Sequence, residues 1–247
     1  MNLFDLTGKV AAVTGSSRGI GRAIAIALAE AGAEIVCVQR STADDNAANE
    51  IRRLGKRAEI VPCDLAEKTR VKQVMRDITA VMGRLDILVN NAGIQRSIPA
   101  EDFSDADWEE VIQINLTSMF TLCREAGKYM IAHSGGKIIN IASLMTFIAH
   151  GNIPAYCAAK SGVAGMTRSL AVQWARHGVS VNAIAPGYIL TDMTRGLESN
   201  AGFVDAIPMG RMGTPPDLAG AAVFLASPAS DYVCGHTLVV DGGVLCV

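Results

Sequence analysis

Apolar residues along the chain fall into two kinds of segment that alternate from one end to the other. Short, nearly continuous apolar runs are typical of strands buried on both faces of a sheet, and longer segments between them favour helices. The predicted strands are Val10–Thr14, Glu34–Val38, Ala58–Val61, Ile87–Asn90, Lys137–Ala142, Ser180–Ala185 and Thr237–Val240. The predicted helices are Ile20–Ala31, Ala43–Leu54, Glu67–Met82, Asp105–Ala132, Ala155–Arg176 and Pro216–Ala226.

This alternation predicts a doubly wound α/β fold in which helical crossovers join parallel strands and cover both faces of one seven-stranded sheet. No shift in composition marks a boundary, so residues 1–247 are expected to form a single domain. Residues 188–212 interrupt the alternation just after a predicted strand, where a loop that covers a substrate is expected.

Composition excludes several classes of function. Half of the 247 residues are hydrophobic and 19% are charged, which is too apolar for a disordered chain. The formal net charge is −2 and no Lys/Arg run occurs, so neither nucleic acid nor a membrane surface is an expected partner. The longest charge-free run, residues 138–159, contains Asn, His and Pro residues and therefore favours a core strand followed by a loop over a membrane span.

The cysteines and histidines show no ligand spacing. The six cysteines, at positions 37, 63, 123, 157, 234 and 246, include no CxxC pair, and the four histidines are scattered. We therefore expect no metal site, and reduced thiols that act mainly as small core residues. The N-terminal residues do not have the pattern of a signal peptide, and together with unpaired cysteines this predicts a cytoplasmic protein.

A glycine-rich turn follows the first predicted strand and precedes an alanine-rich helix. It reads Gly15-Ser16-Ser17-Arg18-Gly19-Ile20-Gly21, with GxxxGxG spacing instead of GxGxxG. Gly15 allows a tight turn, Gly19 lets the backbone approach a pyrophosphate, and Gly21 lets helix and strand pack closely. The helix N-terminus offers free N–H groups and partial positive charge to phosphates, which favours a Rossmann dinucleotide site. The alternative is a glycine turn that serves packing alone.

The end of the second predicted strand bears on the type of cofactor. NAD-binding folds commonly place a carboxylate there, which accepts a hydrogen bond from the ribose 2′-hydroxyl. This chain has Gln39, Arg40 and Ser41 at that point, without a carboxylate. Arg40, helped by Arg18, can pair with a 2′-phosphate through its planar fork of donors, so NADP is predicted to be preferred over NAD. The alternative for Arg40 is a solvated surface charge.

Three polar residues in the second half of the chain suggest proton-transfer chemistry. Tyr156 and Lys160 stand at i and i+4 of a predicted helix, on one face. A nearby ammonium is expected to stabilise the phenolate and lower the tyrosine pKa from about 10. Ser143 follows a predicted strand at the carboxyl edge of the sheet, where its hydroxyl can hold a substrate oxygen. Each feature alone also fits ordinary surface or capping residues.

The motifs taken together resemble one family. In chain order they are Thr14-Gly15-x-x-x-Gly19-Ile20-Gly21, Asn90-Asn91-Ala92-Gly93, Asn115, Ser143, Tyr156-x-x-x-Lys160 and Pro186-Gly187. This set resembles the short-chain dehydrogenase/reductase family, and the resemblance covers nearly the whole chain, up to Asp241-Gly242-Gly243. It implies hydride transfer between the C4 carbon of a nicotinamide and a substrate carbon, with proton transfer between Tyr156 and the substrate oxygen. A homotetramer is also implied.

The resemblance assigns roles to individual residues. It implies that Tyr156 is the general acid/base, that Lys160 lowers its pKa and holds the nicotinamide ribose, and that Ser143 orients the substrate oxygen. Asn115 is expected to hold a water that links Lys160 to solvent. The implied cofactor residues are Gly15, Ser17, Arg18, Gly19, Ile20, Gly21, Arg40, Asp64, Leu65, Asn91, Ala92, Gly93, Tyr156, Lys160, Pro186, Gly187, Ile189 and Thr191.

Three stretches of sequence narrow the range of possible small-molecule substrates. Residues 91–96, 136–143 with 182–188, and 229–243 resemble the gluconate 5-dehydrogenase and 2-deoxy-D-gluconate 3-dehydrogenase branch, which implies a sugar acid or polyol. Arg96 is expected to hold a substrate carboxylate, and His150 to donate to a sugar hydroxyl, beside Ser143 and Tyr156. At position 97 this chain has a serine, whereas members of the branch often have a second basic residue there. The alternatives for Arg96 and His150 are an exposed arginine and a loop histidine.

Two other functions remain open at this point. One is a 3-oxoacyl thioester reductase acting on an acyl carrier protein, for which a basic patch at the site entrance would be expected. The other is a cofactor-bound sensor without turnover, in which one of the four catalytic residue types would be expected to be missing. All four are present.

Overall fold

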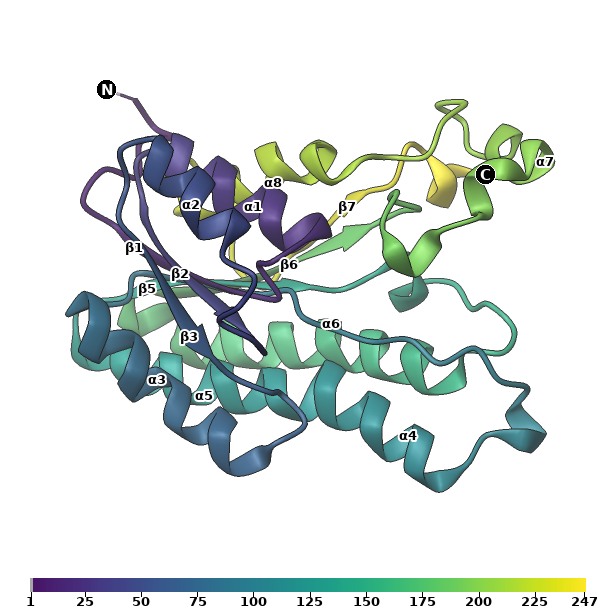
Figure 1. The fold of residues 1–247 in the computed structure, drawn as a ribbon, viewed down its shortest axis with the longest axis horizontal. Helices are drawn as coiled ribbons and strands as arrows, with labels where there is room; N and C mark the ends of the chain where they lie inside the picture. Colours follow the sequence, from purple (N-terminus) through teal and green to yellow (C-terminus); the bar gives the residue numbers. More distant parts are fainter. Residues whose placement is uncertain (1) are drawn as a thin grey trace.

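The computed structural model describes residues 2–247, and a seven-stranded sheet forms its centre (Figure 1). The strands are β1 Val10–Thr14, β2 Glu34–Gln39, β3 Ala58–Pro62, β4 Ile87–Asn90, β5 Gly136–Ile141, β6 Val179–Pro186 and β7 Thr237–Val240. Their order in the sheet is β3-β2-β1-β4-β5-β6-β7, and every neighbouring pair is parallel. The prediction of a doubly wound α/β fold is therefore confirmed.

Helices cover both faces of this sheet (Figure 1). On one face lie α1 Gly19–Glu30, α2 Asn46–Arg53 and α8 Ala219–Ala226, and on the other α3 Lys68–Met82, α4 Asp105–Ile112, α5 Ser118–Ala132 and α6 Pro154–Trp174. Each face has its own hydrophobic core, because the strands are buried on both sides and alternate residues point to opposite layers. The short α7 Ala201–Asp205 lies in the loop region after β6.

One predicted helix is divided in the structure. Residues 105–132 were expected to form one continuous helix, but a π-helical turn over Gln113–Thr117 separates α4 from α5. A π-turn adds one residue to a helical turn, and such turns occur frequently at functional sites. Here the turn contains Asn115, whose carboxamide exchanges two hydrogen bonds with the backbone of Ile94. These bonds attach the turn to the chain after β4.

The sheet order creates a crevice at the carboxyl ends of the strands. The chain proceeds from β1 outward to β3, and then returns to the other side of β1 to form β4 through β7. The loops after β1 and β4 therefore diverge, which is where open α/β sheets bind ligands. The register pairs Thr14 with Val38 and Asn90 with Asn140, so the ends of these strands stand level with one another.

Two glycines bring the first turn and the first helix against the sheet. Gly15 adopts a left-handed backbone conformation, with φ +64°, as it leaves β1. Gly21 lies on α1, and a Cβ atom there would overlap the carbonyl oxygen of Gly15 and the carboxamide of Asn91. Because both neighbours are themselves fixed, the close approach of α1 to the edge of the sheet requires glycine at this position.

We expect the substitution Gly21→Ala to lower the free energy of unfolding by about 1–3 kcal/mol, because it overpacks a fixed backbone contact. The matched control is Gly220→Ala on α8, where an added Cβ would meet no atom within 4 Å. That change is expected to be neutral or to stabilise by about 0.5–1 kcal/mol, since alanine favours helices. Urea denaturation at one protein concentration measures both, and equal midpoints for the two variants would contradict the packing constraint.

Candidate active site

A cleft of about 1200 Å³ runs along the carboxyl edge of the sheet. Its walls come from the ends of β1 to β6, from the start of α6 and from the loop after β6. Every predicted cofactor residue except Gly21 lines this cleft, as do Ser143 and His150. Gly21 lies behind the wall and serves the packing described above. Residues far apart in the sequence thus meet around one cavity.

The part of the cleft around the glycine turn, residues 15–21, is called the cofactor half. The end of β1 fixes the position of its wall. The hydroxyl oxygen of Thr14 accepts hydrogen bonds from the backbone N–H groups of Asn91 and Ala92, at 2.9 and 3.0 Å. The Asn91 carboxamide donates to the Thr14 carbonyl at 2.9 Å. Arg18, at the N-cap of α1, makes no side-chain cap hydrogen bond. The first N–H groups of this helix are therefore available to an anionic ligand.

A side pocket of about 220 Å³ extends the cofactor half. Its lining residues are Ser17, Arg18, Gln39, Arg40, Ser41 and Asp44. The Gln39 carboxamide donates to the carbonyl oxygens of Ser41 and Asp44, at 2.8 and 2.5 Å, and so shapes the loop after β2. Arg18 also forms an ion pair of 3.0 Å with Asp192 of the loop after β6. Two guanidinium groups and two hydroxyl groups around one small pocket suit a phosphate monoester.

The structure brings Tyr156, Lys160 and Ser143 together at the other half of the cleft. Pro154 starts α6, so Tyr156 falls in its first turn and Lys160 one turn later on the same face. The Lys160 Nζ atom is buried, lies 5.6 Å from the centre of the Tyr156 ring and donates to the Ile141 carbonyl at 2.7 Å. Ser143 follows β5, and its Oγ accepts from the Met145 N–H at 3.1 Å.

Burial sets the acidity of this pair, and one expectation is wrong. Desolvation raises the pKa of Tyr156 above its ordinary value, although the Ser143 hydroxyl acts in the opposite direction. Desolvation also lowers the pKa of Lys160 to about 8. The sequence predicted a lowered tyrosine pKa, but desolvation has the largest effect on the pKa of Tyr156, and the Lys160 ammonium donates to the Ile141 carbonyl. The phenol is therefore the form of Tyr156 present at neutral pH.

Asn115 lies behind the cleft wall instead of in it. Its side chain is fully buried, and both ends of its carboxamide are bound to the Ile94 backbone, each at 2.8 Å. Its Oδ1 atom packs against Gly93, and a Cβ atom on that glycine would stand 3.9 Å from the Lys160 Nζ. The carboxamide thus supports the wall next to Lys160.

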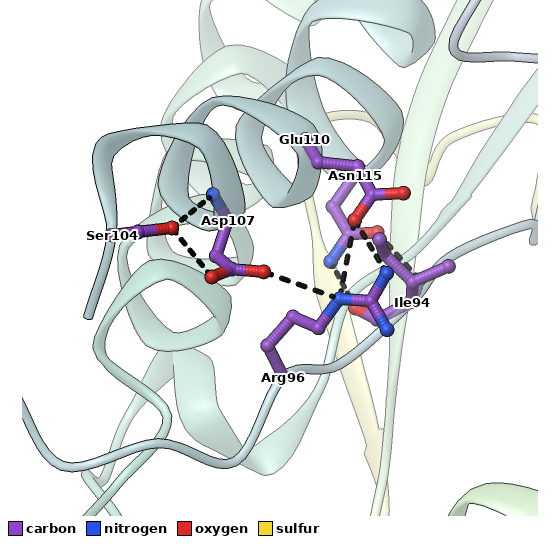
Figure 2. A network of polar contacts seen from close by, with 6 residues as sticks. All are labelled: Ile94, Arg96, Ser104, Asp107, Glu110 and Asn115. Carbon is purple, nitrogen blue, oxygen red and sulfur yellow. Dashed lines mark hydrogen bonds and ion pairs between the residues drawn. The ribbon is translucent and has the colours of Figure 1, made fainter. Parts of the chain in front are cut away.

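Arg96 differs from its predicted role. Its guanidinium does not line the cleft but turns to α4, where Nη2 lies 2.6 Å and Nε 3.1 Å from Glu110 Oε2 (Figure 2). Asp107 Oδ1 lies 3.8 Å from the Nε atom. The physical reason is charge: Glu110 and Asp107 on α4 attract the guanidinium, whereas the neighbouring residues Gln95 and Ser97 line the cleft. Arg96 is therefore no carboxylate ligand in this geometry.

The part of the cleft around Ser143, His150 and Tyr156 is called the substrate half. It is lined by more apolar residues than the sequence motifs indicated. His150 is exposed at the cleft, and its Nδ1 lies 2.8 Å from the Gly151 carbonyl oxygen. The residues that sequence motifs missed are mainly Leu144, Ile153, Tyr188, Leu190, Leu197, Asn200 and Phe203. Tyr188 and Phe203 stack edge to face with ring centres 4.6 Å apart. Met145 and Met193 also line the cleft, whereas Phe147 and Met209 do not.

Residues 2–247 contain neither a candidate metal site nor a helix suited to spanning a membrane. No group of three His, Cys, Asp or Glu side chains within that range is arranged to hold a metal ion. Over the same residues, no helix combines the length and the apolar character needed to span a membrane.

The fold and this cleft define a class of protein: a dinucleotide-dependent oxidoreductase with a tyrosine–lysine–serine site. The comparisons with known proteins lead further. A family model described as "Enoyl-(Acyl carrier protein) reductase" matches residues 15–245. The chain belongs to the short-chain dehydrogenase/reductase family.

Several relatives match from end to end. The 2-dehydro-3-deoxy-D-gluconate 5-dehydrogenase of Pseudoalteromonas atlantica is 46% identical, with 97% of each chain covered. The gluconate 5-dehydrogenase of Gluconobacter oxydans is 40% identical, covering 98% of this chain and 97% of its own. Among solved structures, the gluconate 5-dehydrogenase of Burkholderia cenocepacia, in complex with NADP and tartrate, is 41% identical with a TM-score of 0.95, over 100% of this chain and 98% of that one.

We predict that Tyr156 ionises at a higher pH than a solvent-exposed tyrosine of the same chain, because burial disfavours the phenolate. Subtracting the ultraviolet titration of Tyr156→Phe from that of the wild type isolates this residue. Tyr232, which is fully exposed, provides the matched reference through Tyr232→Phe. A Tyr156 midpoint at or below that of Tyr232 would show that the lysine, and not desolvation, controls the acidity.

Proposed function

We propose that this protein is an NADP(H)-dependent dehydrogenase that interconverts a secondary alcohol and a ketone on a sugar acid or related polyol. The observation that carries the proposal is the meeting of Tyr156, Ser143 and Lys160 in a cleft whose other half carries the glycine turn. The sugar-acid class is supported by relatives of 40–46% identity over nearly the whole chain that are named for such substrates.

The residues of the cofactor half fit NADP. The free N–H groups at the start of α1 suit the pyrophosphate, and Arg18 and Arg40 in the side pocket suit a 2′-phosphate. The NADP in the complex of the Burkholderia cenocepacia relative supports the same choice. When bound, the nicotinamide ring supplies or accepts the hydride.

The remaining cofactor contacts follow the shape of the cleft. Asp64 and Leu65, after β3, border the region for the adenine, and Asn91 to Gly93 border its ribose. On the nicotinamide side, the wall after β6 consists of Pro186, Gly187, Ile189 and Thr191. Lys160 completes the site for the nicotinamide ribose.

Proton transfer is the task of Tyr156. In reduction, the Ser143 hydroxyl holds the substrate oxygen while the Tyr156 phenol, protonated at neutral pH, donates its proton to that oxygen. The Lys160 ammonium nearby stabilises the phenolate that results. Asn115 keeps the wall beside Lys160 in place through Ile94. In oxidation the phenolate must form first, so a raised tyrosine pKa favours oxidation at alkaline pH and reduction at neutral pH.

The loop of residues 188–212 is proposed to cover the substrate, within one dinucleotide-binding and catalytic domain over residues 1–247. Tyr188, Leu190, Met193 and Phe203 give this loop an apolar inner side. Polar residues elsewhere in the lining, namely Gln95, Ser97 and His150, suit the hydroxyl groups of a sugar acid.

Assembly into a homotetramer and a cytoplasmic location are part of the proposal. Trp108 on α4, Phe120 on α5 and Val172 on α6 are exposed apolar side chains on one layer of helices, and Val172 is 82% exposed. Such side chains suit contacts between subunits. Val244 and Leu245 near the C-terminus pack against a cluster of their own chain that includes Leu144. The six cysteines are free thiols, which is typical of a reducing compartment.

Reduction of a 3-oxoacyl thioester is the second candidate function, because the matching family model is described as an acyl carrier protein reductase. The same catalytic residues would serve that reaction. The sugar-acid proposal is preferred because full-length relatives at 40–46% identity carry sugar-acid names.

We expect Tyr156→Phe to lower kcat by about 10²–10⁴-fold, because it removes the proton donor, while NADPH binding stays unchanged. A panel of gluconate, 5-ketogluconate, 2-deoxygluconate and a 3-oxoacyl thioester, read by nicotinamide absorbance, measures turnover and substrate class together. Turnover of the variant near the wild-type rate would refute the role of Tyr156. Activity confined to the thioester would refute the sugar-acid class.

We expect Arg40→Ala to weaken NADP binding by about 10- to 100-fold, because charge-assisted hydrogen bonds to the 2′-phosphate are lost, and to leave NAD binding unchanged. The matched control is Arg53→Ala, an exposed arginine on α2 outside the side pocket. Fluorescence titration with both nucleotides gives the dissociation constants. Equal losses for NADP and NAD would contradict a contact with the 2′-phosphate.

A further inference from the structure

The segment Ile94–Ile98 forms part of the wall of the substrate half. Ile94, Gln95 and Ser97 line the cleft, whereas Arg96 does not. The backbone of Ile94 and Ile98 and the side chain of Arg96 are bonded to neighbouring elements. The segment therefore brings an amide-bearing and a hydroxyl-bearing residue to the cleft and is attached at the positions between and beside them.

Three attachments hold the segment at consecutive alternate positions. The Ile94 backbone is bound by the Asn115 carboxamide of the π-turn through two hydrogen bonds of 2.8 Å. The Arg96 guanidinium is bound by Glu110, with Asp107 near its Nε (Figure 2). The Ile98 N–H donates to the Asn152 carbonyl at 2.7 Å. The first two attachments both lead to the continuous helical unit of α4 and the π-turn.

The part of α4 that binds Arg96 is itself held in place. Ser104 caps α4, and its Oγ accepts from the Asp107 N–H at 3.1 Å. Asp107 and Glu110 stand at i and i+3 of the same helix, so both carboxylates face one side. Arg96 and Glu110 are 45% and 40% exposed, so their ion pair contributes little to global stability. Its structural effect is to fix the short segment Ile94–Ile98 against α4.

The cofactor half has separate attachments. Asn91 and Ala92 are held by Thr14 of β1, on the other side of Gly93 from the Arg96 contact. A change at Arg96 therefore leaves the attachment of the cofactor wall intact while it releases the substrate wall.

We propose that Arg96, through its ion pair with Glu110, is a positioning residue that sets Gln95 and Ser97 against the substrate hydroxyl groups. The inference rests on the proposed function, since it concerns the substrate half of the same cleft. The wall it creates carries neutral donors and acceptors, which match a polyhydroxylated substrate and leave its carboxylate to be bound elsewhere. Arg96 acts on the substrate from outside the cleft.

The experiment compares Arg96→Gln, Glu110→Gln, their double variant and Arg96→Lys. Each glutamine substitution is expected to raise the substrate KM by about three- to fivefold, in line with loss of a half-exposed ion pair, with NADPH affinity unchanged. The double variant is expected to be no worse than the worse single variant, because the pair acts as one unit. Arg96→Lys keeps the charge and is expected to recover most of the effect.

The matched control is Arg57→Gln, which removes an ion pair with Glu59 of similar exposure, away from the cleft. It is expected to leave KM unchanged. Hydrogen exchange of residues 94–98 provides a readout that needs no substrate, and faster exchange there in Arg96→Gln is expected. An unchanged KM and unchanged exchange in Arg96→Gln, or effects that multiply in the double variant, would overturn the inference.

The outcomes for the two proposals are separable. KM is measured with whichever panel compound the wild type turns over, so failure of every sugar acid refutes the proposed function. The positioning role of Arg96 is then tested in the Arg96 and Glu110 variants by the KM for the compound that the wild type turns over and by hydrogen exchange. Turnover of a sugar acid with identical KM and exchange in wild type and Arg96→Gln refutes the positioning role alone.

Discussion

The site depends on one buried charge at the carboxyl end of β5. Lys160 donates to the Ile141 carbonyl at 2.7 Å, and this bond fastens α6 to the strand. Tyr156 stands one turn earlier on that helix, and Ser143 stands two residues beyond Ile141, so both groups reach the same point of the cleft. Burial has an electrostatic consequence, since it lowers the pKa of Lys160 to about 8 and raises that of Tyr156. The fold therefore determines the protonation states of both groups, because burial keeps Tyr156 a neutral phenol while Lys160 is an ammonium at neutral pH.

Around this centre, the two halves of the cleft are supported independently. Thr14 holds the chain after β4 on the cofactor side, and close packing at Gly21 holds α1 against the same edge. On the substrate side, Asn115 and Arg96 tie the next residues to α4 and its π-turn. The boundary between the two systems is Gly93, which packs against Asn115. The short stretch of residues 91–98 can thus border both the cofactor and the substrate.

The fold could be predicted from the sequence because the strands are continuous apolar runs, and Val10–Thr14, Ile87–Asn90 and Thr237–Val240 were predicted with their observed bounds. Gathering of the motif residues in one cleft was also predictable, since they follow parallel strands. The division of residues 105–132 was not, because a π-turn leaves the helical spacing of apolar residues almost unchanged. The side to which Arg96 turns depends on its tertiary contact with Glu110, in a loop without a hydrophobic pattern, and the Tyr156 pKa depends on three-dimensional burial.

The ion pair between Arg18 and Asp192 links the glycine turn to the loop after β6 across the mouth of the cleft. Arg195 also contacts Asp192, so one carboxylate is shared by two guanidinium groups. An anion that engaged Arg18 would compete with Asp192 for it, and this competition would couple coenzyme affinity to the freedom of the loop. Such a coupling would be reciprocal, since a ligand that orders the loop would change the affinity for the nucleotide by the same factor. All three side chains are exposed, so ionic strength tunes the strength of this link.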